Sequence, residues 1–467
     1  MGAVVAADFG STYTKVVAVD LEKEELLGVA QSPSTVDTDM TTGLFRALEQ
    51  LRASMGVDEL EPDKIVAASS AAGGLKVVAA GLVKALTAKA AEEAALGAGA
   101  KLTRAYAYGL TADDLREIEG EAPDLVLLAG GTDGGNRECL LENAGLLARS
   151  KLSVPFIVAG NRLAAGEAAR LLEAGGKDAI VVENVLPELD RLNLEPSRSA
   201  IRDTFMKRII QAKGLDRAQA ILGLIMPTPT AVLAGARLLA EGTGDEEGIG
   251  DLVVVDVGGA TTDVDSVAHG HPSGDAVLKG LPDPYLKRTV EGDLGIRYNA
   301  ETILRRVGAK KLSDRLAAMA PGLPERIDVE TRAEALSRSV ALVPNDELDH
   351  CFDTALSCAA VETAAARHCG RLEEVYFPTG KVRVQHGKDL TGVKALVGTG
   401  GVFAYGRNQE RILRSACFDR GSPESLRPRD PELLVDDRYV LFAVGLLSEL
   451  SPTSALRILK KHLRKLS

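Results

Sequence analysis

The sequence has no tryptophan, and aromatic residues make up only 4% of its 467 positions. A surface that stacks nucleic-acid bases on aromatic rings is therefore not expected, and the core must consist of aliphatic side chains. The formal net charge is −11. Nonspecific nucleic-acid binding requires a basic surface, so this charge argues against nucleic acid as a partner.

Long apolar segments and paired cysteines are also missing. No stretch of 18 or more uncharged apolar residues occurs, which leaves no candidate for a transmembrane helix. The N-terminus enters the strand-like segment Ala3–Ala7 without the basic region and cleavage site of a signal peptide. Five cysteines, an odd number without disulfide-type spacing, indicate a reducing compartment. We therefore expect a cytoplasmic globular protein that does not bind membranes.

A strand-like segment followed by a glycine-rich turn lies near the middle of the chain. Leu252–Val255 is apolar and β-branched, which predicts a buried strand. The turn then offers two glycines and two hydroxyls, Gly258, Gly259, Thr261 and Thr262. Successive amides in such a turn suit phosphate oxygens, and Asp256 suits a hydrated Mg²⁺ beside them. The alternative is a plain β-hairpin with a polar turn.

The first turn of the chain repeats this chemistry. Asp8 ends a strand, Gly10, Ser11 and Thr12 form the turn, and Lys15 begins the next strand. Lys15 offers a positive charge to a phosphate. Alone, this segment reads as a hairpin with a solvated lysine. Together, the two turns are predicted to hold one phosphate chain from both sides.

Between these turns, strands and helices alternate. Strand-like segments at 124–131, 154–161 and 178–185 are separated by helical segments, which predicts a parallel sheet. Ligands bind at the carboxyl ends of such strands. Gly130–Gly135 lies at one of these ends and is either an interaction loop or a site of close strand–helix packing. The glycine-rich segment Glu241–Gly250 is the best candidate for a domain boundary.

The second half contains a long helical segment, 346–369. Cys351, Cys358 and Cys369 are spaced by 7 and 11 residues, which places them on one helical face, flanked by two histidines. A metal cluster is the alternative, but zinc ligands usually lie on turns, so a buried core face is favoured. Residues 273–292 are expected to be irregular.

The C-terminal tail has leucines at helical spacing, Leu456, Leu459, Leu463 and Leu466, with basic residues between them. This pattern favours a terminal helix docked on the protein. A helix that binds a partner or a membrane surface is the alternative.

Three segments resemble, in this order, the two phosphate motifs and the adenosine motif of the actin, Hsp70 and sugar-kinase ATPases. They are Asp8–Lys15, Asp256–Asp263 and Gly398–Gly401. Pro227–Gly235 and Phe442–Glu449 resemble the two connecting helices of these proteins. The resemblance implies an α/β, two-lobed actin-like ATPase fold with duplicated ribonuclease-H-like domains.

Within that superfamily, the chain resembles the glutamate mutase accessory proteins called MutL or GlmL, which are unrelated to the mismatch-repair proteins of the same name. The residues that carry this resemblance are Ala6–Thr12, Ser69–Gly74, Leu96–Ala100, Leu128–Asn136 and Val290–Gly295. The family implies an ATP-dependent reactivating chaperone with weak ATPase activity. Its partner would be an adenosylcobalamin-dependent mutase of the glutamate mutase type, from which it removes damaged cobalamin.

The resemblance also implies roles and domains. Asp8 and Asp256 would hold hydrated Mg²⁺, and Lys15 would contact the phosphates of ATP or ADP. Phosphate donors would be Gly10, Ser11, Thr12, Gly258, Gly259, Thr261 and Thr262, and the adenosine would lie on Gly398, Gly400 and Gly401. Lobe I would comprise 1–75 and 191–249, with 441–467 returning to it. The segment 76–190 would be an inserted α/β domain, and 250–440 would form lobe II.

One position departs from the chaperone pattern. Hsp70-type proteins have a glutamate at the place of Thr228, where it helps to position the attacking water. Threonine does not ionise and is a poor general base, which favours slow hydrolysis, with Asp263 as a substitute carboxylate. Three alternatives stay open: a small-molecule kinase, an actin-like scaffold, and a nucleotide-binding adaptor without turnover.

Overall fold

The computed structural model describes residues 3–10, 13–35, 39–57, 62–70, 75–210, 222–319, 327–340, 342–377 and 380–466. Two of the predicted phosphate donors, Ser11 and Thr12, lie outside the described residues. The chain divides into two compact units. Unit 1 comprises Met1–Ala234 and Gly445–Ser454, and unit 2 comprises Gly235–Val444 and Ala455–Ser467. None of the helices in these described ranges is long and apolar enough to cross a membrane.

The division between the units falls within three helices. These helices are α8 (Thr228–Glu241), α15 (Val440–Leu447) and α16 (Pro452–His462). Two of them, α8 and α15, contain most of the segments that resemble the connecting helices of actin-like ATPases.

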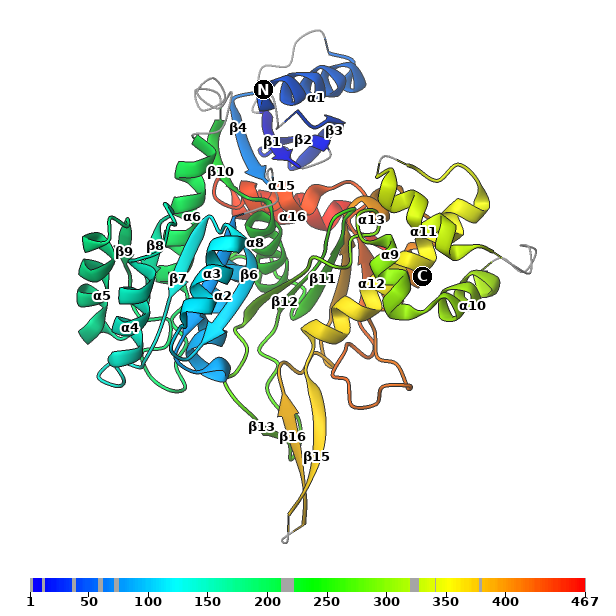
Figure 1. The fold of residues 1–467 in the computed structure, drawn as a ribbon. Helices are drawn as coiled ribbons and strands as arrows, with labels where there is room; N and C mark the ends of the chain where they lie inside the picture. The colour runs from blue at the N-terminus through cyan, green and yellow to red at the C-terminus, as the bar shows by residue number, and fades with distance from the viewer. Residues whose placement is uncertain are drawn as a thin grey trace. The chain divides into compact units, whose positions relative to one another are not determined.

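Unit 1 begins with a five-stranded sheet beside which helix α1 (Met40–Met55) lies (Figure 1). The strand order is β10-β4-β1-β2-β3, with β1 Ala3–Phe9, β2 Tyr13–Asp20, β3 Glu25–Pro33, β4 Lys64–Ser69 and β10 Leu222–Pro227. The central strand β1 is buried throughout, as its aliphatic sequence predicts. It pairs antiparallel with β2 and parallel with β4.

Unit 1 also contains a second sheet in which all neighbouring strands are parallel. Its order is β6-β5-β7-β8-β9, with β5 Lys76–Gly81, β6 Lys101–Ala107, β7 Leu125–Leu128, β8 Phe156–Val158 and β9 Ala179–Val181. The helices between them are a π-helix Lys84–Ala88, α2 Lys89–Gly97, α3 Ala112–Glu121, α4 Glu138–Leu147 and α5 Arg162–Ala174, and α6 Glu195–Ile210 follows. The predicted parallel sheet is confirmed, and its order is that of a doubly wound fold.

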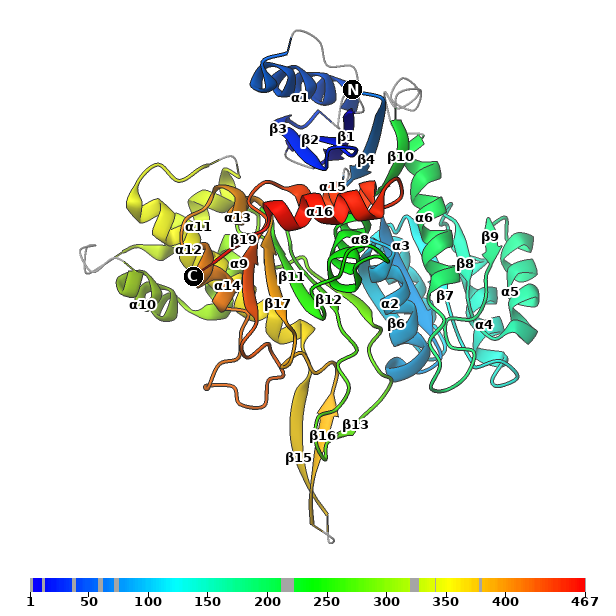
Figure 2. The same ribbon diagram turned by 180° about the vertical axis from the view of Figure 1, so that it is seen from behind.

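Unit 2 repeats the pairing pattern of the first sheet (Figure 2). The order is β14-β12-β11-β17-β18-β19, with β11 Leu252–Val257, β12 Thr262–Val267, β14 Leu286–Glu291, β17 Ala395–Thr399, β18 Glu432–Val435 and β19 Arg464–Lys465. The central strand β11 pairs antiparallel with β12 and parallel with β17, as β1 does with β2 and β4. This duplicated ribonuclease-H-like topology confirms the predicted actin-like ATPase fold.

Strand β14 corrects the expectation that residues 273–292 are irregular. Lys287 and Arg288 interrupt its apolar pattern, but both side chains are buried. Lys287 Nζ lies 2.7 Å from Asp283 Oδ2, and Arg288 Nη2 lies 2.7 Å from Asp263 Oδ2. Because these charges are paired inside the protein, the strand tolerates them, and a pattern based on apolar alternation misses it.

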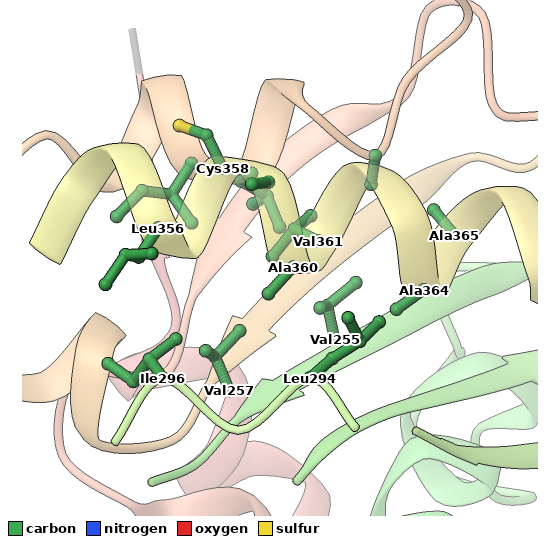
Figure 3. Close-up of a cluster of buried hydrophobic side chains, with 14 of the residues drawn as sticks. Val255, Val257, Leu294, Ile296, Leu356, Cys358, Ala360, Val361, Ala364 and Ala365 are labelled. Carbon is green, nitrogen blue, oxygen red and sulfur yellow. The ribbon is translucent and has the colours of Figure 1, made fainter. Parts of the chain in front are cut away.

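The core of unit 2 lies between its sheet and helix α12 (Glu347–His368), with α9 Ala300–Val307, α10 Ala309–Met319, α11 Val329–Arg338, α13 Gly401–Tyr405 and α14 Gln409–Arg414 around it. Figure 3 shows Ala360 and Ala364 on the side of α12 that faces Val255. The α12 side chains at this contact are small, which lets the helix approach the strand closely.

Cys351 and Cys358 belong to this core, as favoured from the sequence. Cys369, the C-cap residue of α12, is partly buried and packs against the same core, so the favoured core face is confirmed for all three thiols. Burial raises the pKa of Cys369 to about 12. Across the residues that the structure describes, no group of three or more His, Cys, Asp or Glu side chains is arranged to hold a metal ion.

Two further features lie in the second half of the chain. Strands β15 (Arg371–Phe377) and β16 (Gly380–His386) form a ribbon that extends away from the six-stranded sheet of unit 2, with β13 (Val277–Leu278) beside β16 (Figures 1 and 2). Helix α16 buries Leu456 and Leu459, which confirms the docked helix. Leu463 and Leu466 lie beyond its end, because the chain there turns into β19.

Candidate functional site

The two predicted phosphate turns share an equivalent backbone hydrogen bond. The Gly10 amide donates to the Tyr13 carbonyl at 3.0 Å, and the Gly258 amide donates to the Thr261 carbonyl at 2.9 Å. Each glycine follows the aspartate of its central strand by two residues. The structure thus places Asp8 and Asp256 at equivalent positions of two sheets with the same topology.

The residue across the strand from each aspartate differs between the turns. Asp8 of β1 pairs with Lys15 of β2, whereas Asp256 of β11 pairs with Asp263 of β12. Paired residues in antiparallel strands project from the same face of a sheet. The first turn therefore combines a carboxylate with an ammonium group, and the second combines two carboxylates.

Asp8 is buried, and its carboxylate is held by the beginning of α8. Thr228 Oγ1 donates to Asp8 Oδ1 at 2.5 Å. Burial raises the pKa of Asp8, while the positive charge of Lys15 and the Thr228 hydroxyl act in the opposite direction. A buried carboxylate of this kind gains from a nearby cation. Thr228 therefore lies at the predicted site, where it orients Asp8.

In unit 2, the turn after β11 is fixed from behind by the segment Gly292–Asn299. The amides of Arg297 and Tyr298 donate to the Gly259 carbonyl at 2.9 and 3.0 Å. The Asn299 side chain donates to the Ala260 carbonyl at 3.0 Å. These contacts direct the carbonyl groups of the turn toward Gly292–Asn299.

The amides of the same turn are left available. Within the part of the chain that the structure describes, the amides of Gly259, Ala260 and Thr261 donate no hydrogen bond. Three successive free amides in a turn form a concave anion site. The Thr262 hydroxyl, in contrast, donates to the Leu294 carbonyl at 2.8 Å and faces the core.

Gly295 supports this turn and was not identified as a site residue from the sequence. A Cβ atom at Gly295 would overlap the backbone of Ala260, so only glycine fits. The next residues are fixed by Arg297, whose guanidinium binds both carboxylate oxygens of Asp353 in α12, at 3.0 and 2.6 Å. In the sequence, Gly295 at the end of the motif Val290–Gly295 could have indicated a close backbone contact at this position.

The predicted adenosine motif lies against Asp256. Gly400 has a φ of 96°, and a Cβ atom there would overlap Asp256 Oδ1. A Cβ atom at Gly398 would lie 2.6 Å from the Phe403 ring. Both glycines are therefore required by close packing. The structure thus brings Asp256 and Gly400 together within unit 2.

Two tyrosines that the sequence reasoning missed border this motif. The Tyr405 side chain is 63% exposed, and its ring centroid lies 6.3 Å from that of Tyr439. The Tyr439 hydroxyl would lie 3.3 Å from a Cβ atom at Gly401. Tyr439 also has a φ of 55°, an uncommon backbone conformation for a residue with a side chain. The two rings are tilted by 46° relative to each other, and they offer aromatic surface beside Gly401.

Asp436 is a further residue that the sequence reasoning missed. It follows β18 and accepts hydrogen bonds from the amides of Val440 and Leu441 at 2.8 and 2.9 Å, which caps α15. Thr399 Oγ1 donates to the same carboxylate at 3.0 Å. Burial raises the pKa of Asp436, and these hydrogen bonds oppose that effect. An aspartate before a helical apolar run was the available signal.

Asp263 is held by Arg288, and a second acid lies beside it. The Arg288 Nη2 atom contacts Asp263 Oδ2, and the buried Oδ1 of Asp263 has no hydrogen-bond partner among the described residues. Asp265 is also buried, and burial raises its pKa well above the usual value. Arg288 opposes this shift, whereas Asp263 and Asp256 add to it.

The carboxylates fit Mg²⁺ in only one way. The turn after β1 offers one carboxylate, Asp8, and the turn after β11 offers Asp256 with Asp263 paired opposite it. Mg²⁺ usually keeps several waters and binds through one or two carboxylates together with phosphate oxygens. Each carboxylate by itself therefore suits a hydrated Mg²⁺ that arrives with a phosphate ligand, and among the described residues no acidic cluster forms a cage for a bare ion.

Comparisons with known proteins identify relatives of the whole chain. A model of the family described as "MutL protein" matches residues 4–463. The curated relative Protein MutL of Clostridium tetanomorphum is 46% identical over 467 residues, which is 100% of both chains.

Solved structures are more distant. Component A of (R)-2-hydroxyglutaryl-CoA dehydratase from Acidaminococcus fermentans is 11% identical, with 99% of each chain covered and a TM-score of 0.31. A carbohydrate kinase from Novosphingobium aromaticivorans is 15% identical, with 100% of this chain and 94% of that chain covered and a TM-score of 0.33. Because these TM-scores are low, the fold assignment rests on the strand order of the sheets in the two units. The family match and the full-length relative confirm the resemblance drawn from the sequence motifs, and the chain belongs to the MutL family.

Proposed function

We propose that this protein binds ATP with Mg²⁺, hydrolyses it slowly, and reactivates an adenosylcobalamin-dependent mutase of the glutamate mutase type by promoting the exchange of damaged cobalamin. The observation that carries the proposal is the repeated Asp-x-Gly turn, with three free amides after Gly258 and the paired Asp8 and Lys15. Membership of the MutL family supports the accessory role.

In this proposal, each group has a separate task. Asp8 and Asp256 bind waters of the Mg²⁺ ion, which supplies charge neutralisation to the phosphates. Lys15 and the amides of Gly259, Ala260 and Thr261 bind phosphate oxygens. The backbone at Gly400 and Gly401 lies against the adenosine, where the Tyr405 and Tyr439 rings offer a surface for the base.

Slow hydrolysis follows from how the nearby side chains are used. The Thr228 hydroxyl donates a hydrogen bond to Asp8, and threonine has no carboxylate with which to orient water. Asp263 is the substitute, but it is paired with Arg288. Phosphoryl transfer depends mainly on positioning and charge stabilisation, so turnover proceeds without a strong base, at a low rate.

The partner is assigned to the segment 76–190. The Gly130–Gly135 loop lies at the carboxyl ends of its parallel strands, where such folds bind ligands, and it exposes Gly134 and Gly135. Asn161 and Asn184 fix this loop through its backbone carbonyls, at 3.0 Å each. We therefore propose that this preformed loop contacts the cobalamin-binding region of the mutase. In the same proposal, 1–75 with 191–249 and 441–467 forms lobe I, and 250–440 forms lobe II.

Reactivation is tested with a mutase that has been inactivated by turnover and retains damaged cobalamin. The purified chain, ATP, Mg²⁺ and fresh adenosylcobalamin are added, and the recovered mutase activity and released cobalamin are measured. We expect recovery with wild-type protein and none with Asp8→Asn or Asp256→Asn. Exposed Asp203→Asn is the matched control and should behave as wild type. Recovery that is independent of ATP would refute the proposal.

A second candidate is a nucleotide-binding adaptor without turnover, which the Thr228–Asp8 contact favours. The measurement that separates the two is phosphate release under single-turnover conditions. Slow release that disappears in Asp8→Asn, with folding retained, supports hydrolysis. Tight ATP binding with no release on the time scale of reactivation supports the adaptor.

A further inference from the structure

The turn between α2 and β6 is pressed against the beginning of α8, within unit 1. Gly99 in this turn has a φ of 83°, which favours glycine. A Cβ atom there would lie 2.7 Å from Pro227 Cβ and 2.7 Å from Thr230 Oγ1. The backbone of Gly99 therefore lies directly against the junction of β10 and α8. A side chain at Gly99 would push the turn away from this junction.

A hydrogen bond joins the same two elements. Thr230 Oγ1 donates to the Ala98 carbonyl at 3.1 Å. Two residues earlier, in the same first turn of α8, Thr228 donates to Asp8. The first turn of α8 thus binds the Asp8 carboxylate through the Thr228 hydroxyl, and it binds the end of α2 through the Thr230 hydroxyl.

Helix α2 is also fixed by α6, which lies beside it (Figures 1 and 2). Arg198 of α6 is only 8% exposed, and its guanidinium occupies the space where a side chain at Gly97 would lie. Arg198 Nη2 lies 3.5 Å from the Glu93 carbonyl of α2. Helix α2 is therefore held by contacts with both α6 and α8, and it also packs against β5 and β6.

From this chain of contacts we propose that the Leu96–Ala100 turn couples the ligand state of Asp8 to the position of the 76–190 sheet. The inference rests on the proposed function, because the ligand at Asp8 is taken to be Mg–ATP. Gly99 and Thr230 act as positioning residues through Thr228 and do not touch the nucleotide.

The physical reason is that packed elements shift together instead of deforming gradually. A ligand that draws the Asp8 carboxylate toward a cation changes its bond with Thr228, and the first turn of α8 shifts with it. Thr230 and Gly99 pass this shift to α2. Coupling between binding sites is reciprocal, so a partner that binds the 76–190 sheet changes the nucleotide affinity by the same factor.

The coupling is tested by hydrogen exchange of the full chain, with and without Mg–ATP, and nucleotide affinity is measured in parallel by calorimetry. In wild-type protein we expect Mg–ATP to slow exchange at residues 97–101. Thr230→Val keeps the side-chain shape and the Thr228–Asp8 bond but removes the bond to Ala98. We expect this variant to lose most of the protection at residues 97–101. Its affinity for Mg–ATP should stay within about twofold of wild type, which is small beside the roughly fivefold or larger effects of typical allosteric coupling.

Thr363→Val is the matched control, because it removes a hydroxyl–carbonyl bond of the same kind inside α12, where Thr363 Oγ1 lies 2.8 Å from the Ala359 carbonyl. It should retain the protection. Full protection in Thr230→Val, or wild-type protein that binds Mg–ATP with no change at 97–101, would overturn the coupling alone. Wild-type protein that binds no Mg–ATP would overturn the proposed function as well.

Discussion

The Thr228 hydroxyl donates a hydrogen bond of 2.5 Å to Asp8 Oδ1, and this bond joins the first turn of α8 to the end of β1. The residue that stands where Hsp70-type chaperones have a glutamate is thus used to orient the carboxylate assigned to Mg²⁺. A carboxylate at position 228 would repel Asp8, whereas a hydroxyl stabilises its charged form.

Thr228→Val removes this donor with little change in shape. A hydrogen bond to a charged group contributes about 1.5–3 kcal/mol, so we expect the affinity for Mg–ATP to fall at least about tenfold. The loss should grow as the pH is lowered, because burial already raises the pKa of Asp8 and the variant loses an opposing interaction. Calorimetric titrations at several pH values measure both effects. Thr228→Ser retains the donor and serves as the control; equal affinity in the valine and serine variants would contradict the assignment.

Gly295→Ala tests the support of the phosphate turn. A Cβ atom at this position overlaps Ala260, so the turn after β11 has to shift and its free amides lose their arrangement. We expect the variant to remain folded by circular dichroism and to lose Mg–ATP binding. Gly392→Ala is the matched control, since a Cβ atom there meets no atom within 4 Å. Wild-type affinity in Gly295→Ala would show that the turn does not bind the phosphates.

Tyr405→Ala tests the surface for the base. Stacking on an aromatic ring contributes about 1–3 kcal/mol per base, so the affinity for Mg–ATP should fall about tenfold. The affinity for Mg–tripolyphosphate, which has no base, should stay the same. Tyr376→Ala on the β15–β16 ribbon, where the side chain is exposed, controls for the loss of a surface tyrosine. A parallel loss for both ligands would argue against base recognition by Tyr405.

Asp265→Asn tests the buried acid beside Asp263. Burial raises the folded-state pKa of Asp265 well above 3.8, so the folded protein holds the proton at pH values where the unfolded chain has released it. The free energy of unfolding therefore decreases as the pH rises from about 3.8 toward that raised value. The asparagine variant lacks this loss.

We expect Asp265→Asn to be more stable than wild type at neutral pH by on the order of 1 kcal/mol or more, because the wild-type folded state has to bury a charge or hold a proton that the unfolded chain releases. Urea unfolding at pH 5 and pH 7.5 without Mg²⁺ measures the difference, and it should be smaller at pH 5. Exposed Asp203→Asn should show neither effect. A variant that is less stable than wild type at pH 7.5 would indicate that the charged form of Asp265 stabilises the sheet.

Local sequence was sufficient for the two central strands and their turns. Ala3–Asp8 and Leu252–Asp256 are short aliphatic runs that end in an aspartate and a glycine turn, and these features depend only on neighbouring residues. The alternation of strands and helices in 76–190 predicted the parallel sheet for the same reason. The actin-like fold then followed from the order of the motifs.

Only the tertiary structure decided which distant groups complete each turn. Thr228 reaches Asp8 across 220 positions of sequence, and Gly400 packs on Asp256 because β17 lies beside β11. Strand β14 escaped detection since the charges of Lys287 and Arg288 are compensated by residues outside the strand. Periodicity records whether a side chain is apolar, and it carries no information about a partner that becomes a neighbour only after folding.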